Sequence, residues 1–237
     1  MSPFIAEMLG TMFLIILGNG VVANVLLNKT KGNNSGLIVI TFGWAIAVFA
    51  GVYIASNGSA AHLNPAVTLA MASIDKFAWA DVPLYITAQF SGAMSGAIIV
   101  WLAYRQHFDV TTDPALQLGT FCTAPAIRSA GHNLLTEIIG TAVLVMGVLF
   151  MTKPGSSLGT LNALPAALLV LGIGLSLGGP TGYAINPARD LGPRLIHSIL
   201  PIRGKGSSDW GYSWIPIIGP ITGGVIAALL YDYASKA

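Results

Sequence analysis

Six long runs of apolar residues constrain the fold of this chain more than any other feature. Four runs contain no charged residue, and two contain a single glutamate, Glu7 or Glu137. The runs cover residues 3–27, 36–61, 82–104, 132–152, 154–188 and 212–231. A helix of about 20 apolar residues crosses a hydrocarbon core about 30 Å thick. The sequence therefore predicts an all-α membrane protein with six transmembrane helices.

Composition excludes several other classes of protein. Only 8% of the 237 residues are charged, whereas soluble domains carry about 25%. The net charge of +2 is too small to indicate a nucleic-acid partner. A single cysteine, Cys122, excludes an intramolecular disulfide and a cysteine metal cage. The first run lacks a basic segment before it and is too long for the core of a cleavable signal peptide.

The chain repeats one pattern in its two halves. Ala-Glu-x-x-Gly-Thr at residues 6–11 is matched by Thr-Glu-x-x-Gly-Thr at residues 136–141, and Asn-Pro-Ala follows in each half. The separation is 57 residues from Glu7 to Asn64 and 49 from Glu137 to Asn186. Such self-similarity indicates a duplicated unit.

Each unit contains three predicted spans, so the second copy is inverted relative to the first. Inverted repeats place the functional site near the membrane midplane, at interrupted apolar segments. We expect one channel domain over residues 1–237, with repeats at 1–105 and 132–237. The polar segment at 106–131 is expected to be an extramembrane loop.

The two Asn-Pro-Ala motifs predict two half-helices that begin at the centre of the membrane. Asn caps a helix through its side-chain oxygen, and Pro fits the first helical position. The apolar stretches after Pro65 and Pro187 stay helix-compatible to about Ser73 and Leu195. At 1.5 Å per residue they reach about half the membrane thickness.

This arrangement predicts a pore with a definite chemistry. With their oxygens used as caps, Asn64 and Asn186 keep their amide N–H groups as donors. Both helix starts direct positive dipole ends to the same point, which disfavours cations. The backbone before each motif is non-helical and must line a water-filled cavity. Its carbonyls would be acceptors, at Ala60, Ala61, His62, Leu63, Gly182 and Ala184.

Three segments of this chain resemble the major intrinsic protein family, which comprises aquaporins and glycerol facilitators. They are Ala6-Glu7-x-x-Gly10-Thr11, His62-Leu63-Asn64-Pro65-Ala66-Val67-Thr68 and Gly182-Tyr183-Ala184-Ile185-Asn186-Pro187-Ala188-Arg189-Asp190. The resemblance covers essentially the whole chain. It implies six tilted helices plus two half-helices, a homotetramer with one pore per subunit, and cytoplasmic termini in the cell membrane.

The resemblance also implies an outer selectivity filter formed by Trp44, Gly174, Tyr183 and Arg189. Arg189 offers fork-like donors to two adjacent hydroxyls, and the aromatic residues would form an apolar corner. Glycine at position 174, where water-selective relatives usually have His, resembles the glycerol branch. Asp190, Arg194 and Pro216-Ile217 resemble that branch too but are not expected in the pore. Tyr183 departs from the Phe common there, and its hydroxyl leaves the preferred solute open.

Other buried polar residues have competing interpretations. Glu7 and Glu137 could relay protons, because acids within membrane helices are functional by default. Their symmetric placement, and the family pattern, favour a structural role in holding the loop N–H groups. His62 is expected to orient its loop rather than to bind a metal, because no second ligand stands at helical spacing.

The predicted function is a passive channel for glycerol and similar small uncharged solutes, and for water. Alternatives are a water-selective aquaporin, or a facilitator of urea or undissociated hydroxy acids; an ion-coupled transporter is more distant. No enzyme activity, cofactor or metal is expected. With cytoplasmic termini, Lys76, Lys153 and Lys236 lie inside, and seven basic residues lie outside, which opposes the positive-inside rule. The seven are Lys29, Lys31, Arg105, Arg128, Arg194, Arg203 and Lys205.

Overall fold

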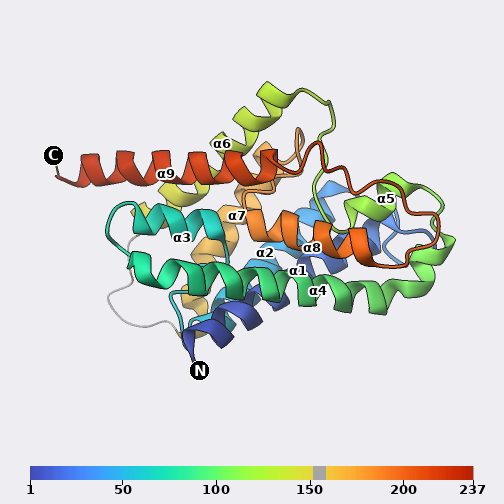
Figure 1. The fold of residues 1–237 in the computed structure, drawn as a ribbon, viewed down its shortest axis with the longest axis horizontal. Coiled ribbons are helices and arrows are strands. Elements are labelled where there is room, and N and C mark those ends of the chain that lie inside the picture. The colour runs from blue at the N-terminus through green and yellow to red at the C-terminus, as the bar shows by residue number, and fades with distance from the viewer. Residues whose placement is uncertain (152–158, 237) are drawn as a thin grey trace.

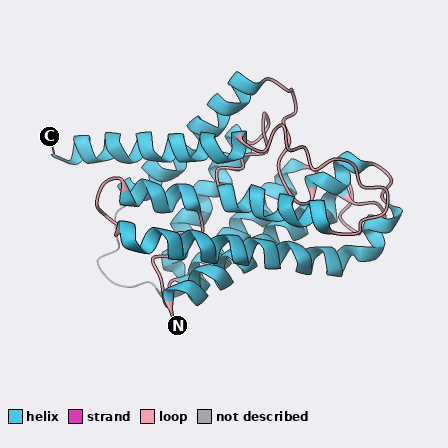
Figure 2. Cartoon of the chain, in the orientation of Figure 1, coloured by secondary structure: helices cyan, strands magenta, loops and turns pink. Residues whose placement is uncertain are grey.

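The computed structural model describes residues 1–151 and 159–236, and it is built from helices joined by loops (Figure 2). The first half contains α1 (Pro3–Leu26), α2 (Leu37–Ala55), α3 (Pro65–Ala72), the 3-10 turn η1 (Trp79–Asp81) and α4 (Val82–Val110). The short helix α5 (Pro114–Gly119) follows. The second half contains α6 (Ala130–Phe150), η2 (Gly159–Ala163), α7 (Leu164–Leu177), α8 (Pro187–Ile199) and α9 (Ile215–Lys236). No strand occurs in these residues.

The two halves pack as corresponding sets of helices. α1 packs against α2 and α4, and its counterpart α6 packs against α7 and α9. The half-helices exchange partners, because α3 packs on α9 and α8 packs on α4. Figure 1 shows α3 and α8 nearly end to end between these long helices. The predicted fold, with two repeats joined around a centre, is confirmed.

Within the described residues, five helices are long and apolar enough to cross a membrane: Pro3–Leu26, Leu37–Ala55, Trp79–Val110, Ala130–Phe150 and Ile215–Lys236. The remaining predicted span appears as a shorter apolar stretch, Leu161–Leu177. The start of its apolar run, at residues 154–158, lies outside the described residues, as does Lys153.

The two half-helices differ in length. α3 ends at Ala72, as predicted, whereas α8 runs four residues past the predicted Leu195 and ends at Ile199. The Lys205 ammonium explains the extension, because it donates to the carbonyls of His197, Ser198 and Leu200 at 2.9, 2.8 and 2.6 Å. These carbonyls have no partner within the helix, and a basic group is favourable at a helix C-terminus.

The segment between the repeats is more ordered and more buried than a polar loop. α4 continues into it as far as Val110, and Asp113 caps α5 by accepting from the Ala115 N–H at 2.8 Å. Beyond α5, Phe121 is buried, and its carbonyl accepts from the Asn19 amide of α1 at 3.1 Å. This segment therefore covers one end of the bundle and packs into it.

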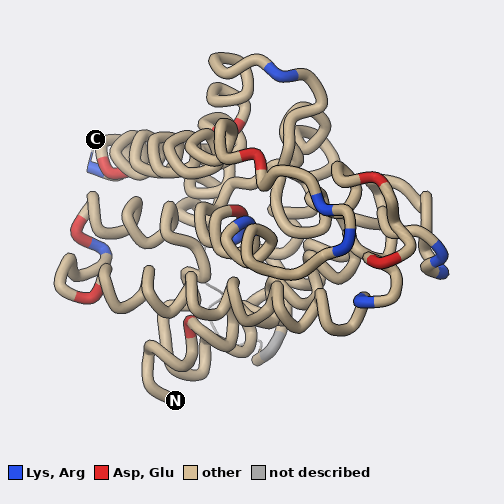
Figure 3. The backbone as a smooth tube through the Cα atoms, turned by 45° about the vertical axis from the view of Figure 1, so that its right-hand side comes forward, with Lys and Arg blue, Asp and Glu red and all other residues tan. Residues whose placement is uncertain are grey.

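Many of the charged residues lie toward the two ends of the bundle, and a smaller number lies between them (Figure 3). Both termini lie toward one end of the long axis, and α5 lies at the other (Figure 1). Large apolar side chains are exposed along the outer faces of the long helices, for example Ile38, Leu102 and Leu229. Such a surface suits lipid rather than water.

Candidate functional site

Each half-helix begins at an Asn cap followed by Pro. Asn64 and Asn186 have extended backbones, with φ of −155° and −157°. The Asn64 side-chain oxygen accepts from the Ala66 N–H at 2.9 Å. The Asn186 oxygen accepts from the N–H groups of Ala188 and Arg189 at 3.0 and 3.2 Å. These side-chain bonds satisfy donors that the first helical turn leaves free.

The two caps are also joined across the repeats. The Asn64 amide nitrogen donates to the Ile185 carbonyl at 2.8 Å, and the Asn186 nitrogen donates to the Leu63 carbonyl at 2.8 Å. The sequence pattern suggests two free donors on each Asn, but each amide uses one of them in this exchange. One N–H per Asn remains for a solute.

Two buried glutamates hold the non-helical segments before the caps. The Glu7 carboxylate accepts from the N–H groups of His62 and Leu63 at 2.9 and 2.8 Å, and from the side chains of Ser59 and Gln89 at 2.7 and 2.9 Å. Each of these contacts pairs the carboxylate with an N–H or O–H group, so the Glu7 side chain acts as an acceptor for the loop.

Glu137 makes the matching set in the second repeat. It accepts from the N–H groups of Ala184 and Ile185 at 3.0 and 2.8 Å, and from the Thr181 hydroxyl at 2.7 Å. Both segments contain left-handed backbone, with φ of 52° at Leu63 and 43° at Ile185. Such strain persists only where the surroundings determine the conformation. The hydrogen bonds that Glu7 and Glu137 accept from these segments hold the backbone in this conformation.

A cavity of about 760 Å³ passes between the two repeats. Near its middle it is lined by Asn64 and Asn186, and Lys76 and Tyr231 line it at the end toward the termini. Of the predicted carbonyl positions, Ala60, Ala61, His62, Leu63 and Ala184 line the cavity, and Gly182 does not. The remaining wall is largely apolar, with Leu14, Val48, Val52, Val67, Leu144, Val148 and Val170. The lumen thus has a polar strip facing an apolar wall.

His62 belongs to an aromatic cluster beside the first segment. Its Nδ1 lies 3.1 Å from the Thr68 hydroxyl, and its ring lies 4.8 Å from Phe77 and 5.2 Å from Tyr85, centroid to centroid. Among the described residues, no group of three or more His, Cys, Asp or Glu residues is arranged to hold a metal ion.

Trp44 and Arg189 stack on one another at the far end of the cavity. The Arg189 guanidinium carbon lies 4.2 Å from the centroid of the Trp44 ring, and both residues are buried. The Trp44 ring is held from behind by α1, because a Cβ at Gly18 would lie 2.3 Å from it. A glycine on the facing helix is therefore required for this position of the ring, which the sequence did not reveal.

Gly174 makes room for Tyr183 and not directly for a solute. A Cβ at Gly174 would lie 2.8 Å from Cζ of Tyr183 and 2.4 Å from the Thr41 methyl, and a Cβ at Gly178 would lie 2.6 Å from Cδ1 of Tyr183. Gly174 does not line the cavity, whereas Tyr183 does. The pair of glycines one turn apart thus sets how far the aromatic ring withdraws from the lumen.

The Tyr183 hydroxyl does not face the lumen. Its oxygen is buried, with no well-formed hydrogen bond to any described residue, on the side where Thr41 meets Gly174. Tyr183 therefore presents the ring, and the extra hydroxyl relative to Phe lies between α2 and α7. The structure brings Trp44, Tyr183 and Arg189 together around one end of the cavity, with Gly174 behind them.

Comparisons with known proteins show what this chain is similar to. The family model described as "Major intrinsic protein" matches residues 1–231. The chain is 60% identical to the "Probable glycerol uptake facilitator protein" of Thermotoga maritima, over 98% of this chain and 99% of that one. It is 40% identical to the "D/L-lactic acid transporter" of Lactiplantibacillus plantarum, over 94% of each chain.

A solved structure shows the same fold. The structure described as "X-ray structure of the aquaglyceroporin from Plasmodium falciparum" superposes with a TM-score of 0.84 at 32% identity. The match covers 97% of this chain and 94% of that one.

Proposed function

Because the chain belongs to the major intrinsic protein family, we propose that it is a passive channel for glycerol and similar small uncharged polyols, and for water. The stacked Trp44–Arg189 pair beside Tyr183 is the observation that carries this proposal. The described residues form no hydrogen bond with the Arg189 guanidinium, so its donors are left for a solute. The 60% identical relative, named for glycerol uptake, supports the same substrate.

The filter would select a polyol by contacting both its hydroxyl groups and its carbon skeleton. Arg189 can donate to two adjacent hydroxyls through its planar fork, while the rings of Trp44 and Tyr183 contact the carbon skeleton. Beyond the filter, the backbone carbonyls accept from the solute hydroxyls, and the apolar wall contacts its CH groups. Diameter and lining hydrogen-bond groups together set selectivity in pores of this type.

Charged species would be rejected at two places. The permanent charge of Arg189 repels cations at the filter, and the positive ends of α3 and α8 repel them at the centre. The remaining amide N–H of Asn64 and of Asn186 would bind the oxygen of a passing solute. No chemical reaction is proposed, and flux follows the concentration gradient.

Stopped-flow measurements on proteoliposomes test the proposal. We expect glycerol to enter much faster than into empty vesicles, without saturation and without dependence on a proton or sodium gradient. Fast water flux without glycerol entry would contradict the polyol channel and indicate a water-selective pore. Gradient-dependent, saturable uptake would instead indicate an ion-coupled transporter.

Undissociated small hydroxy acids form a second candidate class. The similarity to a relative named as a lactic acid transporter favours it, and such an acid presents a hydroxyl next to a carboxyl, much as a polyol presents two hydroxyls. Only the protonated acid is uncharged, so its flux should rise as the pH falls while glycerol flux stays constant. Lactic acid entry that fails to exceed that of empty vesicles at any pH would exclude this class.

We also propose a homotetramer in the cell membrane with cytoplasmic termini. Three of the seven basic residues at the opposite end are engaged within the fold, which removes part of the conflict with the positive-inside rule. Arg128 pairs with Asp209, Arg194 pairs with Asp190, and Lys205 caps α8. Labelling of single cysteines placed at the chain ends in intact cells tests the orientation, and light scattering in detergent tests the tetramer.

A further inference from the structure

A fully buried ion pair lies directly behind the filter. Asp190 follows Arg189 in the chain, and its carboxylate lies 2.8 Å from the Arg194 guanidinium, with both side chains 0% exposed. Removing such a pair from water costs free energy that must be offset by further hydrogen bonds. We therefore asked what else these two charges contact.

The second carboxylate oxygen of Asp190 binds the segment that connects the repeats. It accepts from the Thr123 N–H at 2.8 Å and from the Thr123 hydroxyl at 2.7 Å. Arg194 returns to the same residue, because one of its terminal nitrogens donates to the Thr123 carbonyl at 2.9 Å. Every polar backbone and side-chain group of Thr123 is thus bound to this pair.

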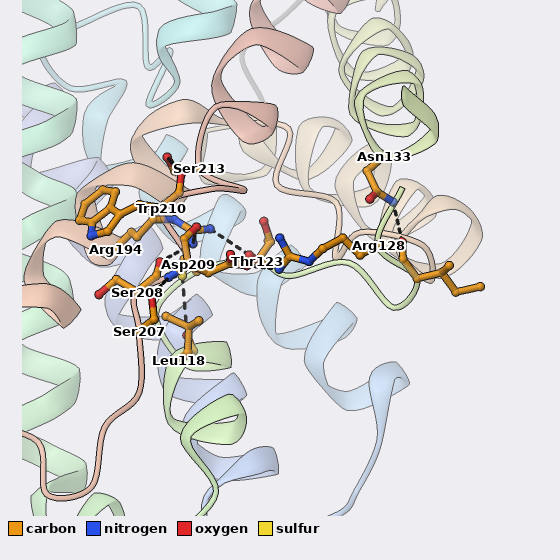
Figure 4. Close-up of polar contacts among 12 residues, drawn as sticks. Leu118, Thr123, Arg128, Asn133, Arg194, Ser207, Ser208, Asp209, Trp210 and Ser213 are labelled. Atoms are coloured by element: carbon orange, nitrogen blue, oxygen red, sulfur yellow. Dashed lines mark hydrogen bonds and ion pairs between the residues drawn. The ribbon is translucent and has the colours of Figure 1, made fainter. Parts of the chain in front are cut away.

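Arg194 extends the network to a third segment of the chain. Its other terminal nitrogen donates to the carbonyls of Ser208 and Asp209 at 2.7 and 3.2 Å. Figure 4 shows Arg194, Thr123 and this Ser208–Asp209 turn converging. We call the set of Thr123, Asp190, Arg194 and the carbonyls of Ser208 and Asp209 the outer clamp.

The outer clamp contacts both ends of the stretch that runs from Gly182 to Asp190. On one side it binds Asp190, the neighbour of Arg189. On the other side the Thr123 methyl lies against Gly182, where a Cβ would be 3.4 Å away, and Gly182 precedes Tyr183. Three residues further, the Ala126 N–H donates to the Pro180 carbonyl at 2.9 Å. The connecting segment therefore braces the stretch that contains both Tyr183 and Arg189.

The first repeat shows that a half-helix does not need such a clamp to be held. The positions that correspond to Arg189, Asp190 and Arg194, counted from the Asn cap, are Val67, Thr68 and Ala72. α3 is held through Glu7, Gln89 and its packing, without an ion pair. The clamp thus occurs only in the repeat that carries Tyr183 and Arg189.

We infer that Thr123, Asp190 and Arg194 are positioning residues that fix the separation of Tyr183 and Arg189 and so set the size limit of the filter. This inference rests on the proposed polyol channel. It predicts that loosening the clamp admits larger polyols relative to glycerol.

The test is the ratio of xylitol to glycerol permeability in the same proteoliposomes. A ratio is independent of how much protein folds, so a merely structural role does not change it. Arg194→Lys keeps the charge but loses the planar fork that reaches three segments. Since a misplacement of about 1 Å can change rates about 100-fold, we expect this ratio to rise at least about threefold.

Thr123→Val provides a milder variant that keeps the side-chain shape and the backbone N–H bond to Asp190. We expect a smaller rise in the same direction, and this variant decides the test if Arg194→Lys does not fold. Arg128→Gln is the matched control, because it breaks the exposed Arg128–Asp209 pair on the same turn (Figure 4) and leaves the clamp intact.

An unchanged or lower ratio in the folded clamp variants would overturn the inference. A rise of equal size in Arg128→Gln would overturn it too, because any loosening of the turn would then suffice. These outcomes differ from failure of the proposed function, in which the unmodified chain itself would not conduct glycerol.

Discussion

The re-entrant segments of the two repeats, residues 59–72 and 181–199, share their supports and differ in their chemistry. Both have an Asn-Pro start, a buried glutamate that binds two consecutive N–H groups, and an amide that crosses to the other repeat. Only the second carries charged residues, with Arg189 at the lumen and Asp190 and Arg194 behind it. Both segments have the same supports, whereas only the second also contains Tyr183 and Arg189, two residues of the proposed filter.

The largest effect is expected where the segments are alike. Glu7→Ala and Glu137→Ala each leave several buried donors without an acceptor, and each such donor costs about 1–3 kcal/mol. We expect both variants to lose several kcal/mol of stability and to yield little folded protein. Thermal unfolding in detergent, followed by size-exclusion chromatography, measures this.

A different result for the two glutamates would contradict the conclusion that they have the same role in the two segments. A Glu137 variant that folds normally but loses a proton-dependent flux would identify a proton relay in the second repeat. Glu→Gln variants serve as controls, since Gln keeps one acceptor oxygen and should fold better than Ala in both repeats.

The next largest effect should come from Arg189→Val, which gives the second segment the residue found at Val67 in the first. Hydrogen bonds from a charged donor contribute about 1.5–3 kcal/mol, so glycerol flux should fall at least about tenfold. Loss of the permanent charge should also increase proton leakage, measured with a pH-sensitive dye trapped in the vesicles. Val67→Ala at the matched position should change both quantities much less.

Gly174→Ala should narrow the filter by displacing the Tyr183 ring toward the lumen. The added methyl would lie 2.8 Å from the Tyr183 ring and 2.4 Å from the Thr41 methyl. We expect glycerol permeability to fall about tenfold and water permeability to fall less, and Gly174→His should have the same effect more strongly. Gly172→Ala is the control, because a Cβ there meets nothing within 4 Å. Equal slowing of water and glycerol would contradict this account.

The smallest effect is expected from Tyr183→Phe. The buried hydroxyl has no well-formed hydrogen bond among the described residues, so its removal should leave stability unchanged or raise it by less than about 1 kcal/mol. The ratio of glycerol to water permeability should change less than about twofold. A larger change in the ratio, measured by stopped-flow light scattering, would place this hydroxyl in the path of the solute.

Local chemistry made much of this fold predictable from the sequence. An Asn cap acts on N–H groups two and three residues away, so Asn64 and Asn186 reveal the start of each half-helix. Spans follow from length and hydropathy, and the inverted topology follows from the repeat. The fold predicted in this way is confirmed by the comparisons, and so is the family, which was inferred from the resemblance of three motifs.

Contacts distant in sequence were not predictable in the same way. The hydrogen bond from the Asn64 amide to the Ile185 carbonyl joins residues 121 positions apart. The Lys205 side chain that caps and lengthens α8 comes from a separate loop. Gly174 was expected to leave space for a solute, but the strained backbone of Tyr183, with φ of 38°, turns its ring into that space. Such outcomes depend on how two segments dock, which neither segment specifies alone.

The crossed amide bonds at the centre also bear on the order of synthesis. When the first repeat enters the membrane, the Asn64 amide and the Leu63 carbonyl have no partner, because both partners lie more than 120 residues downstream. Neither repeat alone can complete the midpoint of the pore. A partly synthesised chain therefore offers no finished passage through the membrane until the second re-entrant segment meets the first.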